Sequence, residues 1–308
     1  MGDSAGKYGV RSSLYPLVSL RKVEALLGWR RLDLDRVAAS VERHYHPFML
    51  AKRGGGERPI DNPSRALKSL QKRINRRILQ TVELPDTLMG AAKGKSIRDN
   101  GRVHVGHHMV VTGDIEEFFP SVRPERVFDI LVEVYGCSTR IASLLTRLTT
   151  YQRRLPQGAP TSSTLAGLAI LPLHDALRGV VERKGCEGSV WCDDVAVSGG
   201  LEALEVMRWL PGETRRHGYR LSPSKTRMMP RGNGPQRITG TIVNARVSRG
   251  RRELERIRRN IIALGRAQDV DKGVLASLKG EISHTTHLNS VQGENLLRLA
   301  RKCLPASF

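Results

Sequence analysis

The sequence has few cysteines, a shortage of acidic residues and no long apolar run, and each of these excludes a class of protein. Its 308 residues include four cysteines without a Cys-x-x-Cys pair, and its nine histidines show no His-Glu-x-x-His spacing. A disulfide scaffold and a structural zinc site are therefore excluded, and a reducing cytosol is favoured. No segment approaches the roughly 18 apolar residues of a membrane-spanning helix, and the first residues show no signal-peptide pattern. We expect a cytoplasmic protein with no membrane partner.

The shortage of acidic residues leaves a large positive charge. The chain has 51 lysines and arginines against 30 aspartates and glutamates, a formal net charge of +21. This excess implies a polyanionic partner such as nucleic acid. The hydrophobic content of 39% is ordinary for a globular protein, and the length allows a large core divided into two or three subdomains.

Two adjacent aspartates lie at the turn of a predicted β-hairpin. The stretch from Gly188 to Gly199 indicates a short apolar strand, a tight turn holding Asp193 and Asp194, and an alternating second strand. Neighbouring carboxylates repel each other and lose hydration when buried, a conflict that a divalent cation resolves. A solvated Asp-Asp turn is the alternative, and a lone pair would favour it.

A third carboxylate changes that balance. Asp114 follows the apolar strand Met109 to Val111 and precedes a helix-start signature. A carboxylate at a strand end, together with a paired-Asp hairpin, suits a site for two Mg²⁺ ions that activate a hydroxyl and neutralise a triphosphate. In so basic a chain, three such carboxylates suggest nucleic acid and nucleotide as substrates.

At this point the chain resembles the retron-type reverse transcriptases, which are bacterial RNA-directed DNA polymerases. The motifs follow the family's order and cover most of the chain from about Arg53 to Leu288; they are Asp114–Ser121, Leu155–Ser162, Cys192–Asp194, Leu221–Thr226 and Arg237–Asn244. In addition, Asn100 to His104 falls where retron enzymes carry Asn-Ala-x-x-His, with Gly101 in place of the alanine. The combination is specific, although no single motif is.

The resemblance implies an α+β fold shaped as a right hand of fingers, palm and thumb, with an antiparallel palm sheet covered by helices. Residues 1–107 would form the N-terminal helices and fingers, and residues 108–245 the palm, with 123–156 returning towards the fingers. Residues 246–308 would form the thumb.

Local patterns predict the elements themselves. Residues 1–20 are weakly patterned and are expected to be frayed or loosely docked. The predicted elements are two short helices in 21–45 broken at Gly28, a hairpin over 47–60, a basic helix over 67–78, a helical stretch over 127–148 broken near Gly136, a helix over 164–184 kinked at Pro172, a helix over 201–218 perturbed at Pro211, and Arg-rich helices beyond 245.

The resemblance also assigns the catalytic site. Asp114, Asp193 and Asp194 are the expected catalytic residues, and with the backbone carbonyl of Ile115 they are the expected ligands of two Mg²⁺ ions. Asp194 would either bind a metal or support the residues that do. Trp191-Cys192 replaces the usual Tyr-Ala before the Asp pair, which affects contacts to the primer end more than the chemistry.

A second group of residues is assigned to the incoming deoxynucleoside triphosphate. Lys52 and Arg58, on adjoining strands of the glycine-tipped hairpin, would clamp the triphosphate, although a solvated basic loop is as compatible with the sequence. Gln157 would touch the nucleotide near its sugar or phosphates, and Gly158 would let a base pair approach the backbone. Lys225 would lie on the pyrophosphate side, where a surface lysine is the alternative.

An aromatic gate against ribonucleotides is also implied. Phe119, five residues after Asp114, matches the ring that would clash with a 2′-hydroxyl. Phe118 is the competing candidate, and a core aromatic is the alternative for both.

Nucleic-acid contacts are expected from two regions. One is the motif that holds Asn100 and His104. The other is the Arg-rich segment after residue 245, whose expected contacts are Arg251, Arg252, Arg258 and Arg259. The basic face of the helix over 67–78 is either solvated or tracks a phosphate backbone.

The function implied is reverse transcription of a cognate structured non-coding RNA, primed from an RNA 2′-hydroxyl, into RNA-linked single-stranded DNA. Retron systems act in antiphage defence with an effector protein. One alternative is another defence-associated or group II intron-like reverse transcriptase, against which Ile238-Thr239-Gly240 favours the retron. The alternative of another class is a non-catalytic RNA-binding scaffold, against which the three aspartates and Gln157-Gly158 argue.

Overall fold

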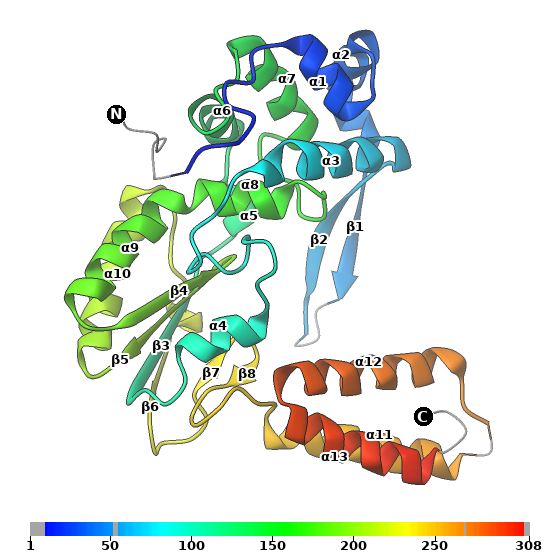
Figure 1. The fold of residues 1–308 in the computed structure, drawn as a ribbon, viewed down its shortest axis with the longest axis vertical. Coiled ribbons are helices and arrows are strands. Elements are labelled where there is room, and N and C mark those ends of the chain that lie inside the picture. The colour runs from blue at the N-terminus through cyan, green and yellow to red at the C-terminus, as the bar shows by residue number, and fades with distance from the viewer. Residues whose placement is uncertain (1–9, 52–54, 268, 305–308) are drawn as a thin grey trace.

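The computed structural model describes residues 10–51, 55–267 and 269–304. At its centre lies a four-stranded antiparallel sheet with the strand order β4-β5-β3-β6 (Figure 1). The strands are β3 (Met109–Asp114), β4 (Glu187–Trp191), β5 (Asp194–Gly199) and β6 (Arg227–Pro230). The predicted Asp-Asp hairpin is therefore confirmed as β4–β5, with a turn at Cys192 and Asp193.

One face of this sheet is covered by two helices. Val111, Val195 and Val197 are fully buried against α9 (Leu171–Arg183) and α10 (Glu202–Arg216), in the largest core of the protein. Side chains alternate between the faces of a strand, so Asp114 and its cross-strand partner Asp194 lie on the opposite face.

The face that carries the aspartates is only partly covered. The helix α4 (Ile97–Val103) and the short hairpin β7 (Arg237–Ile238)–β8 (Thr241–Ile242) pack on it, with Val110, Ala196, Ile238 and Val243 as their core. They lie towards the Val110 end of β3 (Figure 1), and the aspartates at the other end of the strand are half-buried.

The helices α8 (Ser162–Ala169) and α9 form the predicted kinked segment, bent by 50° at a break before Pro172. The prediction over 127–148 is also confirmed, as α6 (Pro124–Glu133) and α7 (Thr139–Thr149) on either side of Gly136. By contrast, α10 runs through Pro211 without interruption. A short helix α5 (Phe118–Ser121) follows β3.

The N-terminal part contains α1 (Leu20–Leu27) and α2 (Arg31–Ala39), separated at Gly28, which ends α1 in the left-handed conformation as predicted. The expectation of a loosely docked start is wrong for residues 10–20, because Val10 and Leu17 are buried in the main core. Residues 1–9 lie outside the described part. Tight docking here follows from burial of isolated apolar residues, which leaves no periodic pattern.

The predicted hairpin over 47–60 is present as β1 (Tyr45–Ala51) and β2 (Glu57–Pro63), followed by the basic helix α3 (Arg65–Arg77). Short 3₁₀ segments lie in the connections, among them η2 (Val41–His44), η3 (Leu79–Thr81) and η4 (Pro223–Lys225).

The C-terminal residues form a three-helix bundle of α11 (Arg251–Arg266), α12 (Lys272–Leu288) and α13 (Ser290–Cys303). The bundle has its own core, in which Ile257, Ile261, Leu278, Ile282 and Leu296 are buried. It lies at the opposite end of the molecule from α1 and α2 (Figure 1).

No single helix in the described ranges is long and apolar enough to cross a membrane, and one bent pair, α8 with α9, could do so by length and composition only.

Candidate active site

Three carboxylates meet at one end of the central sheet. Asp114 ends β3 directly opposite Asp194, the first residue of β5, and Asp193 lies in the adjoining turn. The backbone N–H of Ile115 donates to the carbonyl of Asp193 over 2.8 Å. The antiparallel register therefore unites residues that are 80 positions apart in the chain (114 and 194).

The segment from Thr87 to Gly90 packs against the turn that holds Asp193, a contact that the sequence did not predict. The N–H of Val190 donates to Thr87 O at 3.0 Å, and the N–H of Gly90 donates to Val190 O at 3.3 Å. Cys192 adopts a left-handed conformation with φ 54°, which is uncommon outside glycine. A Cβ on Gly90 would lie 2.4 Å from the backbone nitrogen of Cys192, so glycine is required at this close approach.

The electrostatics of the three carboxylates are unfavourable without a cation. Burial, followed by the charge of Asp114, raises the pKa of Asp193. Burial, followed by the charges of Asp193 and Asp114, raises the pKa of Asp194 to about 6. Lys225 supplies one positive charge: its Nζ lies 2.6 Å from Asp114 Oδ1, and this hydrogen bond raises the lysine pKa.

The carboxylate oxygens of this cluster are the ligands that Mg²⁺ prefers, and their mutual repulsion is the condition that a bound cation relieves. In the described part of the chain, however, no three His, Cys, Asp or Glu side chains are arranged as a metal-holding group. The donor chemistry fits a divalent metal, and Lys225 holds one of the donors.

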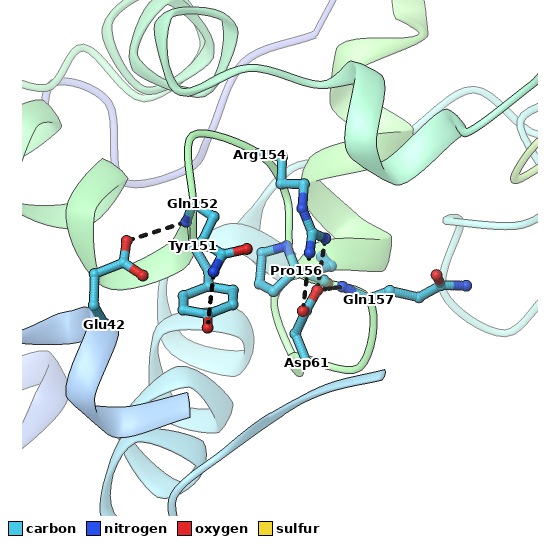
Figure 2. A network of polar contacts seen from close by, with 8 residues as sticks. Glu42, Asp61, Tyr151, Gln152, Arg154, Pro156 and Gln157 are labelled. Atoms are coloured by element: carbon cyan, nitrogen blue, oxygen red, sulfur yellow. Dashed lines mark hydrogen bonds and ion pairs between the residues drawn. The ribbon is translucent and has the colours of Figure 1, made fainter. Parts of the chain in front are cut away.

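A buried ion pair links the β1–β2 hairpin to the loop after α7. Arg154 donates from Nη1 and Nη2 to the two carboxylate oxygens of Asp61, at 2.7 and 3.0 Å. The backbone N–H of Gln157 donates to Asp61 Oδ2 at 2.9 Å, and the N–H of Asp61 donates back to Gln157 O at 2.8 Å. Figure 2 shows the Gln157 side chain pointing away from this network. Asp61 therefore sets the position of the loop and leaves the Gln157 amide free for another partner.

The same contact gives a structural reason for glycine at position 158, while its predicted role beside a base pair stays a prediction. Its φ is +125°, and a Cβ there would lie 3.0 Å from the side chain of Ile60. Sequence reasoning missed Asp61 altogether. Its only signal was an acidic residue directly after the predicted hairpin.

The two candidate gate residues have different environments. Phe118 is 3% exposed and packs edge-on against Tyr219, with ring centroids 5.6 Å apart. Phe119 is only partly buried against the same core. Phe118 is thus a core aromatic, and Phe119 keeps a partly free ring.

The hairpin residues assigned to the triphosphate are only partly described. Arg58 is exposed on β2, paired in register with Leu50. Lys52 lies outside the described residues.

Asn100 and His104 do not reach the surface. His104 is fully buried, and its ring nitrogens Nδ1 and Nε2 each lie 2.8 Å from a serine hydroxyl, Ser198 on β5 and Ser189 on β4. Burial lowers its pKa to about 3. Asn100 is buried beside Thr239. As placed here, neither side chain can contact nucleic acid, because both are enclosed between α4, the sheet and the β7–β8 hairpin.

The four arginines expected to bind nucleic acid are all exposed on α11. Arg251 pairs with Glu255 one turn further along the helix, at 2.8 Å. The bundle core instead takes Ile257 and Ile261 from this helix, so the arginine side chains project away from it.

Comparisons with known proteins identify relatives of this chain. The family model for reverse transcriptase (RNA-dependent DNA polymerase) matches residues 50–246. The chain is 33% identical over 276 residues to the Retron Mx65 reverse transcriptase of Myxococcus xanthus, covering 83% of this chain and 64% of that protein. It is 26% identical over 305 residues to the Retron Se72 reverse transcriptase of Salmonella heidelberg, covering 94% and 80% respectively.

Among solved structures, telomerase from Candida tropicalis in complex with a TWJ fragment of telomeric RNA matches with a TM-score of 0.50. The match covers 89% of this chain and 57% of that one, at 10% sequence identity. At this identity, the likeness concerns the fold alone.

Proposed function

Because the chain belongs to the reverse transcriptase family, among its retron-type members, we propose that it is an RNA-directed DNA polymerase acting on a cognate structured non-coding RNA. The observation that carries the proposal is the register that sets Asp114 opposite Asp194, with Asp193 in the adjoining turn. Deoxynucleoside triphosphates would be the second substrate.

The fold is a right hand of fingers, palm and thumb, with the central antiparallel sheet as the palm. We assign residues 1–107 to the N-terminal helices and fingers and 108–245 to the palm, with 123–156 returning towards the fingers. Residues 246–308 would be the thumb. The separate core of the C-terminal bundle supports the last of these boundaries.

The carboxylates of Asp114, Asp193 and Asp194, with the carbonyl oxygen of Ile115, would hold two Mg²⁺ ions. When bound, such ions activate the attacking hydroxyl and neutralise the triphosphate. In this structure, Lys225 donates a hydrogen bond to the Asp114 carboxylate. Phosphates arriving beside Asp114 would give this lysine a second anionic partner, to which it would donate a proton as pyrophosphate leaves.

The remaining residues would bind and select the nucleotide. Arg58 and Lys52 on the fingers hairpin would neutralise the triphosphate. Gln157, held by its backbone to Asp61, would contact the nucleotide with its free side chain. Gly158 would admit the base pair, and the partly free ring of Phe119 would exclude a 2′-hydroxyl.

The finer features of the function rest on the likeness to retron enzymes. They are priming from an RNA 2′-hydroxyl, a product of single-stranded DNA linked to RNA, an effector protein as partner, and a role in antiphage defence in the bacterial cytoplasm. The basic charge of the chain, +21, supports a nucleic-acid partner.

The test of this function is primer extension by the double variant Asp193→Asn with Asp194→Asn. Loss of the metal-binding charges removes several kcal/mol of transition-state stabilisation, so the rate should fall at least about a thousandfold. Binding of structured RNA should stay nearly unchanged. The matched control is Asp33→Asn with Asp35→Asn on the exposed side of α2, which should extend normally. Extension at the wild-type rate by the first variant would contradict the proposal.

A further inference from the structure

The helix α3 carries a charge pattern that is unfavourable for an isolated protein. Its 13 residues include six lysines and arginines and no acidic residue. Lys68 and Lys72, Lys72 and Arg76, and Arg73 and Arg77 are four positions apart. Like charges at this spacing are neighbours on the helix surface and destabilise it. A polyanion bound along the helix would relieve this repulsion.

A pocket of about 540 Å³ lies between α3 and α1, and its lining is mostly cationic. Arg73, Arg76 and Arg77 enter it from α3, and Lys22 enters it from α1. We call it the α1–α3 pocket. None of these four residues has an ion-pair partner among the described residues, and no carboxylate lines the pocket.

One of these cations is held in place by the fold. Arg73 Nη1 donates to the carbonyl of Leu27 at 2.7 Å, at the end of α1. A Cβ on the neighbouring Gly28 would lie 2.6 Å from this nitrogen, so the absent side chain makes room for the guanidinium. The hydrogen bond thus holds the Arg73 guanidinium in one position at the side of the pocket.

We propose that the α1–α3 pocket binds the phosphate backbone of a double-stranded part of the structured RNA, an inference that rests on the proposed function. Protein partners are held by buried aromatic and apolar anchors, and this pocket has no aromatic lining residue. A-form duplexes are recognised largely through their backbone and shape, which suits a row of cations without base-reading groups. The pocket lies near the opposite end of the molecule from the C-terminal bundle (Figure 1). An RNA that touches both must span the long axis of the protein.

The test compares two triple variants of the full chain that lose the same charge. Lys22→Gln, Arg76→Gln and Arg77→Gln together remove three of the pocket's four cations and leave the structural Arg73. The control is Arg183→Gln, Arg208→Gln and Arg215→Gln, three exposed positions on α9 and α10. Affinity is titrated at several salt concentrations for a hairpin RNA of about 16 base pairs, the span of a typical duplex-binding domain, and for polyglutamate.

The pocket variant should bind the hairpin RNA at least about tenfold more weakly at 0.1 M salt, with a salt slope smaller by about 2 to 3. The control should change far less, and extension of a short generic primer–template at saturating concentrations should be unchanged in both. An equal loss in the control, an unchanged slope, a larger loss for polyglutamate than for RNA, or a loss of extension would overturn the proposal. Inactivity of the wild-type chain would instead refute the proposed function without affecting the binding result.

A second variant separates charge from folding. Arg76→Lys with Arg77→Lys keeps both charges and should bind the hairpin RNA within about threefold of wild type, since phosphate contacts depend mainly on charge. A tenfold loss in this variant would show that the arginines act in packing and not on phosphate.

Discussion

Carboxylates removed from solvent in this protein occupy two different electrostatic environments. The Asp61 side chain, 2% exposed, accepts two hydrogen bonds from Arg154 and one from a backbone N–H, so its charge is fully compensated inside the protein. Asp193 and Asp194 have only each other, Asp114 and one lysine nearby, and burial raises the pKa of both. A compensated charge holds structure, whereas an uncompensated cluster retains affinity for a cation.

We predict that Arg154→Gln lowers the free energy of unfolding by about 3 to 5 kcal/mol, because Asp61 would remain buried without its cation. Urea unfolding measures this change. The adjacent Arg153 pairs with Glu125 at the exposed surface, and Arg153→Gln should change stability little. Equal effects of the two substitutions would show that the buried pair has no special role.

The gate assignment predicts a change in sugar selectivity. Phe119→Ala should lower discrimination against ribonucleotides at least about tenfold, since removing a clash of more than about 1.4 kcal/mol changes a rate ratio by that factor, while deoxynucleotide incorporation persists. Competitive incorporation assays measure the ratio. Phe118→Ala should instead cost about 3 to 5 kcal/mol of stability, as a core aromatic. A Phe119→Ala enzyme as selective as wild type would transfer the role to Phe118 or dismiss it.

At the scale of elements, a buried histidine joins the end of α4 to the central sheet. His104 joins the neighbouring strands β4 and β5 through Ser189 and Ser198, and these strands lead directly into the turn that holds Asp193. A neutral imidazole can donate from one nitrogen and accept at the other. The retron-like motif from Asn100 to His104 therefore holds structure in this protein, on the same sheet face as Asp114 and Asp194.

The burial of His104 makes the stability of the protein fall as the pH is lowered. The pKa of His104 is lowered to about 3, first by burial and then by the nearby His107, against a usual value of 6.5. Below about pH 6.5 the unfolded chain gains a proton that the folded protein excludes, so stability falls as pH drops towards 3. Between pH 7 and pH 5, the protonation of His104 in the unfolded chain should lower the free energy of unfolding by about 2 kcal/mol.

Urea unfolding of wild type and His104→Gln at pH 7 and pH 5 measures how much free energy of unfolding each protein loses between the two pH values. The difference between the two losses is the contribution of His104. Part of the pH dependence should remain in the variant, because burial also lowers the pKa of His174 on α9 to about 4. Identical pH-induced losses in the two proteins would mean that His104 is not held neutral by burial.

At the scale of the whole molecule, the positive charge is distributed over both ends of the long axis. The exposed arginines of α11 lie on the C-terminal bundle, and the cations of α3 lie towards the other end of the molecule (Figure 1). Separate cationic regions on one molecule can hold one RNA at two places, which makes binding steeply dependent on salt.

Replacing Arg251, Arg252, Arg258 and Arg259 by glutamine should weaken RNA binding and lower the salt slope by about 0.7 to 0.9 for each phosphate that is no longer neutralised. Fluorescence titration at several salt concentrations measures the slope for cognate and unrelated RNA. The matched control is Arg256→Gln, because Arg256 pairs with Glu281 on α12. This substitution should affect the stability of the bundle and leave the slope nearly unchanged. An unchanged slope in the fourfold variant would show that these arginines are only a solvated face.

Local patterning was sufficient to locate the Asp-Asp hairpin, the strand before Asp114, the break at Gly28 and the kink before Pro172. Each of these depends on residues close together in the chain, where alternation, helical periodicity and the geometry of proline and glycine act directly. The meeting of the three aspartates also followed from the sequence, because each lies at or beside the end of a predicted strand, while their catalytic role stays a prediction.

Tertiary structure alone decided the contacts over long separations. The pair of Asp61 with Arg154 joins residues 93 positions apart, the approach of Gly90 to Cys192 joins residues 102 apart, and the burial of His104 depends on two strands that follow it by more than 80 residues. Periodicity shows which side of an element is apolar but not what packs against it. A charged or polar residue therefore looks the same in sequence whether water or a distant partner satisfies it, and only the folded chain distinguishes the two.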